Sequence, residues 1–314
     1  MNKSVLMTII VLLIIFAVIT IAAEVILFLT SNGHANLDFA IKNSKKSEHE
    51  KLRDELRRRD WEWLQKQKTE EYFINSNDGL RLRALYLLAP EGEGSNRLAF
   101  CIHGIQSNGT REFVTAARYF YEHGIGSFII DQRACGKSEG RYVTYGCREA
   151  GDCLLWLDFI KAEFGADMRV FVYGMSMGGT ITVLLGGSRL PENVEYLVAD
   201  CGYASVRKQM YFTFASLKLP HKLFYALYKC ACLVHGIYNP DMVYIMQAAK
   251  ACKLPVLFIH GNSDKVVPVE NVHELYEACG SEDKRLLVND GIGHVQSFAA
   301  SEQVREAIIA GMSQ

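Results

Sequence analysis

An excess of one charge, abundant proline and internal repeats are all missing from this chain of 314 residues. Its 34 Lys and Arg residues balance 35 Asp and Glu residues, and this formal net charge of −1 argues against a nucleic-acid partner. Six prolines and 25 glycines exclude a collagenous or low-complexity chain. What remains, 49% hydrophobic and 22% charged residues, is typical of a globular protein with a large buried core.

The nine cysteines lack the paired spacing of a secreted disulfide scaffold. Their number is odd and they are scattered over a large chain, so we expect reduced thiols in a reducing compartment. No Cys-x-x-Cys pair is present, and we interpret Cys230 and Cys232 as small buried hydrophobic residues rather than metal ligands. A Gly-rich dinucleotide or phosphate loop is also missing, so we predict neither a metal nor a cofactor.

One long apolar run is present at the N-terminus. Residues 4–23 carry no charge, and after Glu24 the run resumes over 25–30. About 20 apolar residues in a helix span the ~30 Å hydrocarbon core of a bilayer. A cleaved signal peptide is the alternative, but the run is longer than a typical h-region and no clean A-x-A site follows it. We therefore predict a single-pass membrane protein with a transmembrane anchor over 4–30, and membrane lipid as a partner.

The distribution of positive charge predicts the orientation of this anchor. Upstream of it only Lys3 and the amino group are positive, whereas residues 42–59 contain eight Lys and Arg residues. The positive-inside rule then places the large domain on the cytoplasmic side, in agreement with the unpaired cysteines.

The rest of the chain divides into a short connecting region and one domain. Residues 31–70 are interpreted as a polar linker and a charged helix that begins with a capping box at 47–50. Residues 71–314 start with a predicted β-hairpin and then alternate between apolar strand-like runs and helix-length stretches. The strand-like runs are 98–102, 127–130, 170–173, 194–199, 256–259 and 286–288. The helix-length stretches are 110–123, 147–164, 177–189 and 269–279.

This alternation predicts an α/β protein with a mostly parallel β-sheet flanked by helices. One interval, about 203–250, has no obvious strand and is rich in Phe, Tyr, Leu and Met. We expect two or three short helices there, forming a small helical cap over one end of the sheet.

The strongest local motif is Gly-x-Ser-x-Gly at 174–178, between a predicted strand and a predicted helix. A sharp strand-to-helix turn crowds the backbone around a serine held in a strained conformation, and only residues without a Cβ fit there. Such a turn exposes the Ser176 hydroxyl beside the free N–H groups of a helix N-terminus. Ser176 could be an ordinary helix N-cap, but this context favours a nucleophile.

A serine hydroxyl is a poor nucleophile at neutral pH and needs a base that an acid orients. Asp264 follows the strand-like run 256–259, and His294 follows the run 286–288. Because the carboxyl ends of parallel strands meet at one edge of a sheet, we expect both side chains near Ser176. Asp200, at the end of the run 194–199, is an alternative acid.

Two backbone N–H groups are candidates for an oxyanion hole. Ile105 lies in the loop that follows the run 98–102, and Met177 is the residue after Ser176. Donors of this kind contribute about 3–4 kcal/mol each to transition-state stabilisation in comparable sites. Among the histidines, His103 and His260 stand at strand ends beside glycine and are interpreted as structural.

From about Glu70 to Gln314 the chain resembles the α/β-hydrolase superfamily, and within it the bacterial membrane-anchored hydrolases of the serine aminopeptidase-like and Bem46-like group. The resemblance rests on His103-Gly104, the loop 131–140, the elbow at Ser176, the segment 200–205, the Asp264 loop and His294. It implies the α/β-hydrolase fold, a triad of Ser176, Asp264 and His294, and Ile105 and Met177 as oxyanion donors. Many relatives have Gly-His where this chain has Ala134-Cys135.

These features together predict a serine hydrolase that cleaves a small-molecule carboxylic ester, resembling a carboxylesterase or lipase, through an acyl-enzyme. Cleavage of an amide or short peptide, thioester hydrolysis and acyl transfer use the same residues and stay open as alternatives. A different class of function is a non-catalytic membrane-bound interaction protein that keeps the fold as a platform.

Overall fold

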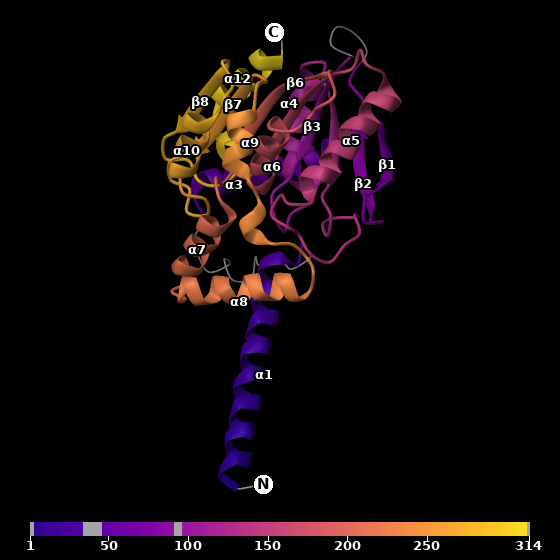
Figure 1. Ribbon diagram of the computed structural model, residues 1–314. Helices are drawn as coiled ribbons and strands as arrows, with labels where there is room; N and C mark the ends of the chain where they lie inside the picture. The colour runs from indigo at the N-terminus through magenta and orange to yellow at the C-terminus, as the bar shows by residue number, and fades with distance from the viewer. Residues whose placement is uncertain (1–2, 34–45, 91–95, 313–314) are drawn as a thin grey trace.

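The structure, a computed structural model, describes residues 3–33, 46–90 and 96–312. Its centre is an eight-stranded sheet with the order β1-β2-β4-β3-β5-β6-β7-β8 (Figure 1). β1 pairs antiparallel with β2 and β2 with β4, and the remaining pairs are parallel. The strands are β1 (Thr69–Asn75), β2 (Arg81–Leu87), β3 (Arg97–Ile102), β4 (Gly126–Asp131), β5 (Arg169–Met175), β6 (Val194–Asp200), β7 (Val256–Gly261) and β8 (Lys284–Asn289). The predicted hairpin and all six predicted strands are therefore present.

Local sequence signals account for where several helices begin. At α3 (Glu48–Leu64) Ser47 and Glu50 form the expected capping box. Asn108 caps α4 (Gly109–Glu122) by accepting a hydrogen bond from the N–H of Arg111. The other helices are α1 (Lys3–Ser31), α5 (Glu149–Phe164), α6 (Met177–Gly186), α7 (Val206–Ser216), α8 (His221–Val234), α9 (Ile245–Ala251), α10 (Glu270–Ala278), α11 (Ser297–Ala300) and α12 (Glu302–Met312), with a short 3-10 turn, η1 (Pro240–Met242).

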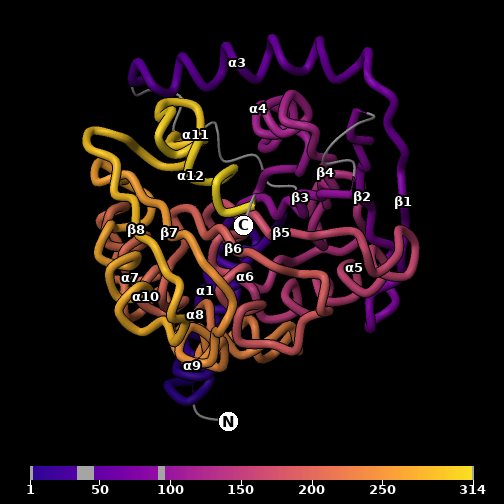
Figure 2. The backbone as a smooth tube through the Cα atoms, turned by 90° about the horizontal axis from the view of Figure 1, so that it is seen from above, coloured from indigo at the N-terminus to yellow at the C-terminus, as the bar shows by residue number. Residues whose placement is uncertain are grey.

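Helices cover both faces of the sheet (Figure 2). Because successive side chains of a strand point to opposite faces, each central strand contributes to two cores. In β3, Leu98 and Phe100 pack into the core beneath α5 and α6, whereas Ala99 and Cys101 pack into the core beneath α4 and α12. This three-layer arrangement is the α/β-hydrolase fold that the sequence predicts.

α1 is long and apolar enough to cross a membrane, and its most apolar stretch is not buried in the protein. Only its C-terminal end is packed against the domain, where Ala23, Ile26, Leu27 and Ser31 are buried. Hydrogen bonds continue this contact: the Tyr145 hydroxyl donates to the carbonyl of Thr30 at 2.6 Å. The helix therefore projects from the domain but is not loosely attached to it (Figure 1).

The segment 203–250 contains α7, α8, η1 and α9. α7 and α8 pack against each other, and α8 also packs against the end of α1. α9 packs elsewhere in the domain, against α6 and α10. Figure 1 shows α7 and α8 at the end of the domain from which α1 leaves.

Candidate active site

Ser176 lies in the turn between β5 and α6, with a positive φ of 56° and a ψ of −119°. The two flanking glycines are required by contacts with backbone. A Cβ added at Gly178 would lie 1.9 Å from the carbonyl oxygen of Ile102, and one at Gly174 would lie 2.0 Å from the carbonyl oxygen of Gly178. The Gly-x-Ser-x-Gly spacing is thus a steric requirement of this turn, as its sequence context predicts.

A chain of hydrogen bonds joins the three side chains predicted from the sequence. His294 Nε2 lies 2.9 Å from Ser176 Oγ, and His294 Nδ1 lies 2.6 Å from Asp264 Oδ2. Asp264 follows β7 and His294 follows β8, so both come from loops at the carboxyl edge of the sheet. This geometry lets the imidazole accept the serine proton at one nitrogen while the carboxylate fixes the other.

The Asp264 carboxylate is fully buried, yet both of its oxygens are hydrogen-bonded. Its Oδ1 accepts from the N–H groups of Val266 and Val267 at 2.8 and 2.9 Å, and its Oδ2 also lies 3.3 Å from His260 Nε2. Burial alone would raise the pKa of Asp264, but the hydrogen bonds from His260 and His294 outweigh it and hold the pKa well below its ordinary value. The carboxylate therefore stays ionised.

The sequence indicates only a structural role for His260 and does not predict its contact with Asp264. The signal that could have found it is the spacing of four residues from His260, at the end of β7, to Asp264. His103, the other histidine of this kind, accepts a hydrogen bond from the N–H of Gln132 at 3.0 Å and is fully buried.

Asp200, the alternative acid, lies at the end of β6 directly behind the serine. Its carbonyl oxygen accepts from the N–H of Ser176 at 2.8 Å, and its carboxyl accepts from the Tyr173 hydroxyl at 3.3 Å. Burial raises the pKa of Asp200 to about 6. Among the described residues His294 Nδ1 donates its hydrogen bond to Asp264 and not to Asp200.

The two candidate oxyanion donors come from the start of α6 and from the loop after β3. Met177 is the first residue of α6, so its N–H has no partner within the helix. Ile105 follows Gly104, and a Cβ added at Gly104 would lie 3.1 Å from the Cβ of Ser176. The loop is fixed there because the Gly104 N–H donates to Glu112 Oε2 at 2.5 Å, from the first turn of α4.

Residues 95–237 and 238–297 match the family described as Serine aminopeptidase, S33. The chain belongs to this family. The matched residues include Ser176, Asp264 and His294, so the candidate site lies inside the region that defines membership.

Curated relatives of this family include proteins of bacteria and fungi. YqkD of Bacillus subtilis is 25% identical over 217 residues, which is 68% of this chain and 69% of that protein. Protein bem46 of Schizosaccharomyces pombe is 22% identical over 68% of this chain and 66% of its own length. YNL320W of Saccharomyces cerevisiae, named a membrane protein, is 25% identical over 56% of this chain and 57% of its own length. These relatives place the chain in the Bem46-like group of α/β-hydrolases.

Solved structures support the same fold. The Pyrococcus furiosus esterase Pf2001 superposes with a TM-score of 0.63 at 22% identity, covering 79% of this chain and 92% of that one. An α/β serine hydrolase homologue from Coxiella burnetii superposes with a TM-score of 0.52 at 18% identity, covering 77% of this chain and 96% of that one. Fold and family together identify the protein as a hydrolase of the α/β type.

The Ala134-Cys135 dipeptide lies in a loop that contacts the segment just after α1. Ala134 has a positive φ of 60°, a conformation that glycine adopts without strain. A Cβ added at Gly33, just after α1, would lie 2.1 Å from the carbonyl oxygen of Ala134. In this chain the loop therefore packs directly against the end of the apolar helix.

One group of metal-ligating side chains is found among the described residues. The ligand atoms of Cys201, Asp264 and His294 lie within 4.8 Å of one another. Burial raises the pKa of the Cys201 thiol well above its ordinary value, so the thiolate that a metal requires is disfavoured. Asp264 and His294 already bind each other, and the arrangement fits proton transfer better than cation binding.

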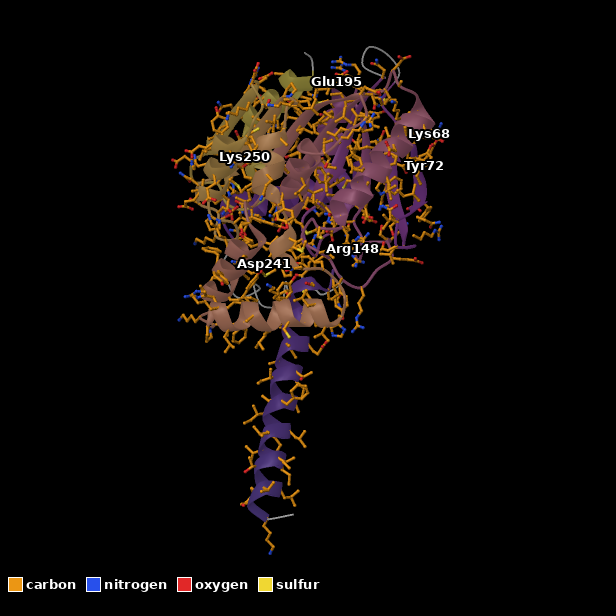
Figure 3. The ribbon with its side chains drawn as sticks, in the orientation of Figure 1. Lys68, Tyr72, Arg148, Glu195, Asp241 and Lys250 are labelled. Carbon is orange, nitrogen blue, oxygen red and sulfur yellow. The ribbon has the colours of Figure 1, made fainter. Side chains whose placement is uncertain are left out.

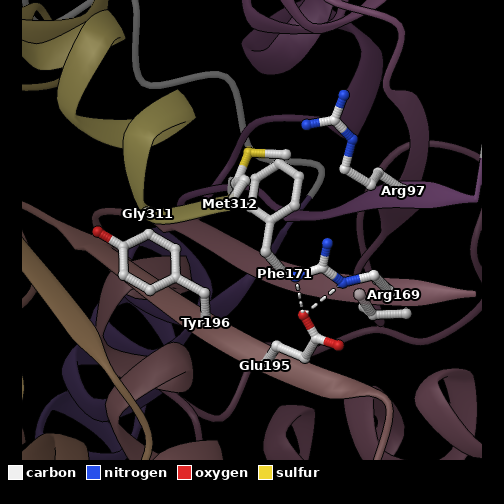
Figure 4. Close-up of a pocket in the computed structure, with 8 residues that line it drawn as sticks. Arg97, Arg169, Phe171, Glu195, Tyr196, Gly311 and Met312 are labelled. Carbon is white, nitrogen blue, oxygen red and sulfur yellow. Dashed lines mark hydrogen bonds and ion pairs between the residues drawn. The ribbon is translucent and has the colours of Figure 1, made fainter. Parts of the chain in front are cut away.

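A small cavity at the opposite edge of the sheet is shown in Figure 4, where Arg169 and Glu195 form an ion pair at 2.7 Å. It lies at the amino end of β5, whereas Ser176 follows the carboxyl end of that strand. This cavity is therefore separate from the candidate active site.

Proposed function

We propose that this protein is a membrane-anchored serine hydrolase that cleaves a carboxylic ester through an acyl-enzyme. The observation that carries the proposal is the continuous hydrogen-bonded series from Asp264 through His294 to Ser176, at 2.6 and 2.9 Å. A binding platform has no need for a base within 2.9 Å of a strained serine.

In the proposed mechanism Ser176 Oγ attacks the ester carbonyl while His294 Nε2 takes the serine proton. The carbonyl oxygen becomes an oxyanion that the N–H groups of Ile105 and Met177 stabilise. His294 then gives its proton to the departing alkoxide, which leaves as an alcohol. Water attacks the acyl-enzyme through the same steps, with His294 again as the base, and releases the acid.

We propose an ester of a hydrophobic acid as the substrate class. The cap helices α7 and α8 are rich in aromatic residues, and the rings of Phe214 and Phe224 lie 5.9 Å apart. The oxyanion loop also touches the end of α1, because Gln106 Nε2 donates to the carbonyl of Leu29 at 2.9 Å. The loop beside the candidate site thus lies on the side of the domain from which the apolar helix leaves. The esterase described for Pyrococcus furiosus is consistent with this chemistry.

The membrane location is part of the same proposal. α1 serves as the anchor, and the excess of Lys and Arg downstream of it favours a cytoplasmic hydrolase domain. A yeast relative named as a membrane protein supports the anchoring.

Labelling with a fluorophosphonate, which phosphonylates activated serines, tests the proposal on the full chain in detergent micelles. We expect labelling of the wild type and none of Ser176→Ala. The matched pair Asp264→Asn and Asp200→Asn then identifies the acid. Loss of the orienting carboxylate slows reaction by about 10⁴-fold in comparable triads, so we expect a loss of that size for Asp264→Asn and a change below about tenfold for Asp200→Asn.

A folded wild-type protein that does not react would contradict the serine hydrolase and support the interaction-protein alternative. A large loss with Asp200→Asn alone would move the acid to β6.

Amide cleavage is the second candidate, because the matching family is described as a serine aminopeptidase. Hydrolysis of an ester and an amide of the same acyl chain distinguishes these two activities.

A further inference from the structure

α8 has apolar side chains on two opposite faces. One face packs into the protein through Tyr225, Tyr228, Ala231 and Cys232. The other points to solvent and carries the exposed apolar stripe, defined as Leu223, Ala226, Cys230, Leu233 and Val234. These five positions follow the spacing of a helix face, three or four residues apart with one adjacent pair. A helix on the surface of a soluble domain normally carries polar residues there.

The stripe is exposed to an extent that the fold itself does not explain. Leu223 is 56% exposed, Leu233 50% and Val234 75%. Leu217, in the turn that precedes α8, is 61% exposed. Contiguous exposed apolar residues of this kind mark a surface that contacts another apolar phase or a partner.

The position of α8 in the molecule indicates what the exposed apolar stripe contacts. α8 runs across the direction of α1 at the point where α1 leaves the domain (Figure 1). His235, immediately after α8, is paired with Glu24 of α1 at 2.6 Å. Ala23 and Ile26 are already buried by the domain, so the free part of α1 extends from Lys3 to Ala22. About 20 residues at 1.5 Å each give ~30 Å, the thickness of a bilayer core, which places the bilayer surface at the level of α8.

Charged residues at the start of α8 fit the same surface. Lys218 and Lys222 are exposed, and neither forms an ion pair within the described ranges. Lysine side chains beside an apolar helix face can extend their ammonium groups to lipid phosphates while their methylenes stay in the apolar region. Lys229, further along the helix, is instead paired with Asp241 at 2.6 Å.

We propose that α8 is an interfacial helix that rests in the membrane into which α1 inserts. The exposed apolar stripe lies at the boundary of headgroups and acyl chains, and Lys218 and Lys222 contact lipid phosphates. This inference rests on the proposed membrane anchoring by α1. It adds a second point of attachment, which holds the carboxyl edge of the sheet, and with it Ser176, toward the lipid.

The native thiol of Cys230 gives a direct probe of this helix. Cys147 and Cys230 are the exposed cysteines, and the other seven are buried. In the full chain with Cys147→Ser, a nitroxide spin label is attached to Cys230. Its relaxation is measured with oxygen, which concentrates in lipid, and separately with a nickel chelate, which stays in water. The reagent that relaxes the label more shows whether the label lies in lipid or in water. The protein is reconstituted in vesicles of phosphatidylcholine and phosphatidylglycerol. The control carries the label on Glu195→Cys, with Cys147→Ser and Cys230→Ser, at the end of the domain far from α1 (Figure 3).

We expect the label at position 230 to be relaxed more by oxygen than by the chelate, and the label at position 195 to show the reverse. Greater relaxation by the chelate at both positions, in protein that resists extraction with alkaline carbonate, would overturn the interfacial helix and leave the anchor standing. Protection of position 230 from both reagents would instead indicate a second protein copy on the stripe, which also contradicts the proposal. Release of the protein by carbonate would contradict the anchor itself.

Discussion

Asp200 and Asp264 are two buried carboxyl groups whose surroundings move their pKa values in opposite directions. Burial is the largest influence on both and acts to raise the pKa. Asp264 receives hydrogen bonds from two histidines and two backbone N–H groups, which reverse that effect. Asp200 receives only weak bonds, from Tyr173 and the Cys201 thiol, and its Oδ1 has no geometric hydrogen-bond partner among the described residues. Their environments therefore separate two carboxyl groups that the sequence alone leaves as competing candidates.

This difference predicts how the stability of the wild type depends on pH. Between the ordinary pKa of 3.8 and the folded-state value of about 6, the folded protein holds the Asp200 proton more tightly than the unfolded chain. Its contribution to the free energy of unfolding is complete below about pH 4 and falls by up to about 3 kcal/mol as pH rises through 6. For Asp264, whose folded-state pKa is lowered, the sign is opposite: its contribution is present above its ordinary pKa and is lost in acid.

Asp200→Asn should remove the pH dependence of stability that comes from Asp200. We expect this variant to melt at a higher temperature than the wild type at pH 8 and to lose that advantage near pH 4, as measured by thermal unfolding of the full chain in detergent. Tyr173→Phe, which removes the bond to Asp200 but keeps the carboxyl, is the control. An equal melting difference at both pH values would contradict a buried carboxyl with a raised pKa.

At this scale the sequence predicts the order and spacing of Ser176, Asp264 and His294, because each stands in a loop after a strand-like run. The structure brings these three together. The partner His260 could not be predicted in the same way, since a buried histidine beside glycine carries no sign of the direction in which its ring points. Only the packing of the loop after β7 turns its Nε2 toward Asp264.

Gly178, at the turn between β5 and α6, and Gly151, in α5, form a matched pair for glycine variants. A methyl group at Gly178 would meet the backbone of Ile102, which cannot move without distorting β3. We expect Gly178→Ala to lower the free energy of unfolding by more than about 3 kcal/mol or to prevent folding. Gly151, in α5, has open space around an added Cβ, and Gly151→Ala should raise that free energy by up to about 1 kcal/mol. Equal effects of the two changes on the melting temperature would show that the turn tolerates a side chain.

The docked end of α1 predicts a link between the anchor helix and the oxyanion loop. Gln106 has a positive φ of 54°, and its side chain binds the carbonyl of Leu29. Losing a hydrogen bond worth about 1 kcal/mol should slow phosphonylation of Ser176 about fivefold in Gln106→Ala. Tyr228→Phe, which removes the bonds to Ser31 and Tyr238 without touching the loop, is the control and should lower the melting temperature but leave that rate unchanged. Identical rates for Gln106→Ala and the wild type would separate the loop from α1.

Strands and helices of the α/β domain are predictable from the sequence because their apolar runs are long and separated by clear turns. The packing of α1 against the domain is not. The sequence places Ser31 at the start of a polar linker, yet this serine is fully buried and bonded to the Tyr228 hydroxyl. A contact between residues 197 positions apart leaves no local pattern in the chain.

For the whole molecule, the orientation across the membrane is testable through one thiol. Cys147 is exposed in the domain and lies away from α8 in the sequence. If the domain is cytoplasmic, a membrane-impermeant maleimide should label this cysteine in the Cys230→Ser variant only after the cells are opened. Labelling in intact cells at the same rate would place the domain outside. A denatured sample, in which all remaining thiols react, controls for the total.

The close attachment of α1 also determines whether the rate of the proposed enzyme depends on the substrate concentration in water or in the bilayer. A hydrogen bond of 2.9 Å joins the apolar helix to the loop of Gln106. A domain held in this way cannot turn its site toward bulk water, so it would search for substrate in two dimensions. Its turnover rate should then depend on the mole fraction of ester in the bilayer. Adding inert phospholipid at constant total ester lowers that mole fraction, so it should slow turnover by surface dilution.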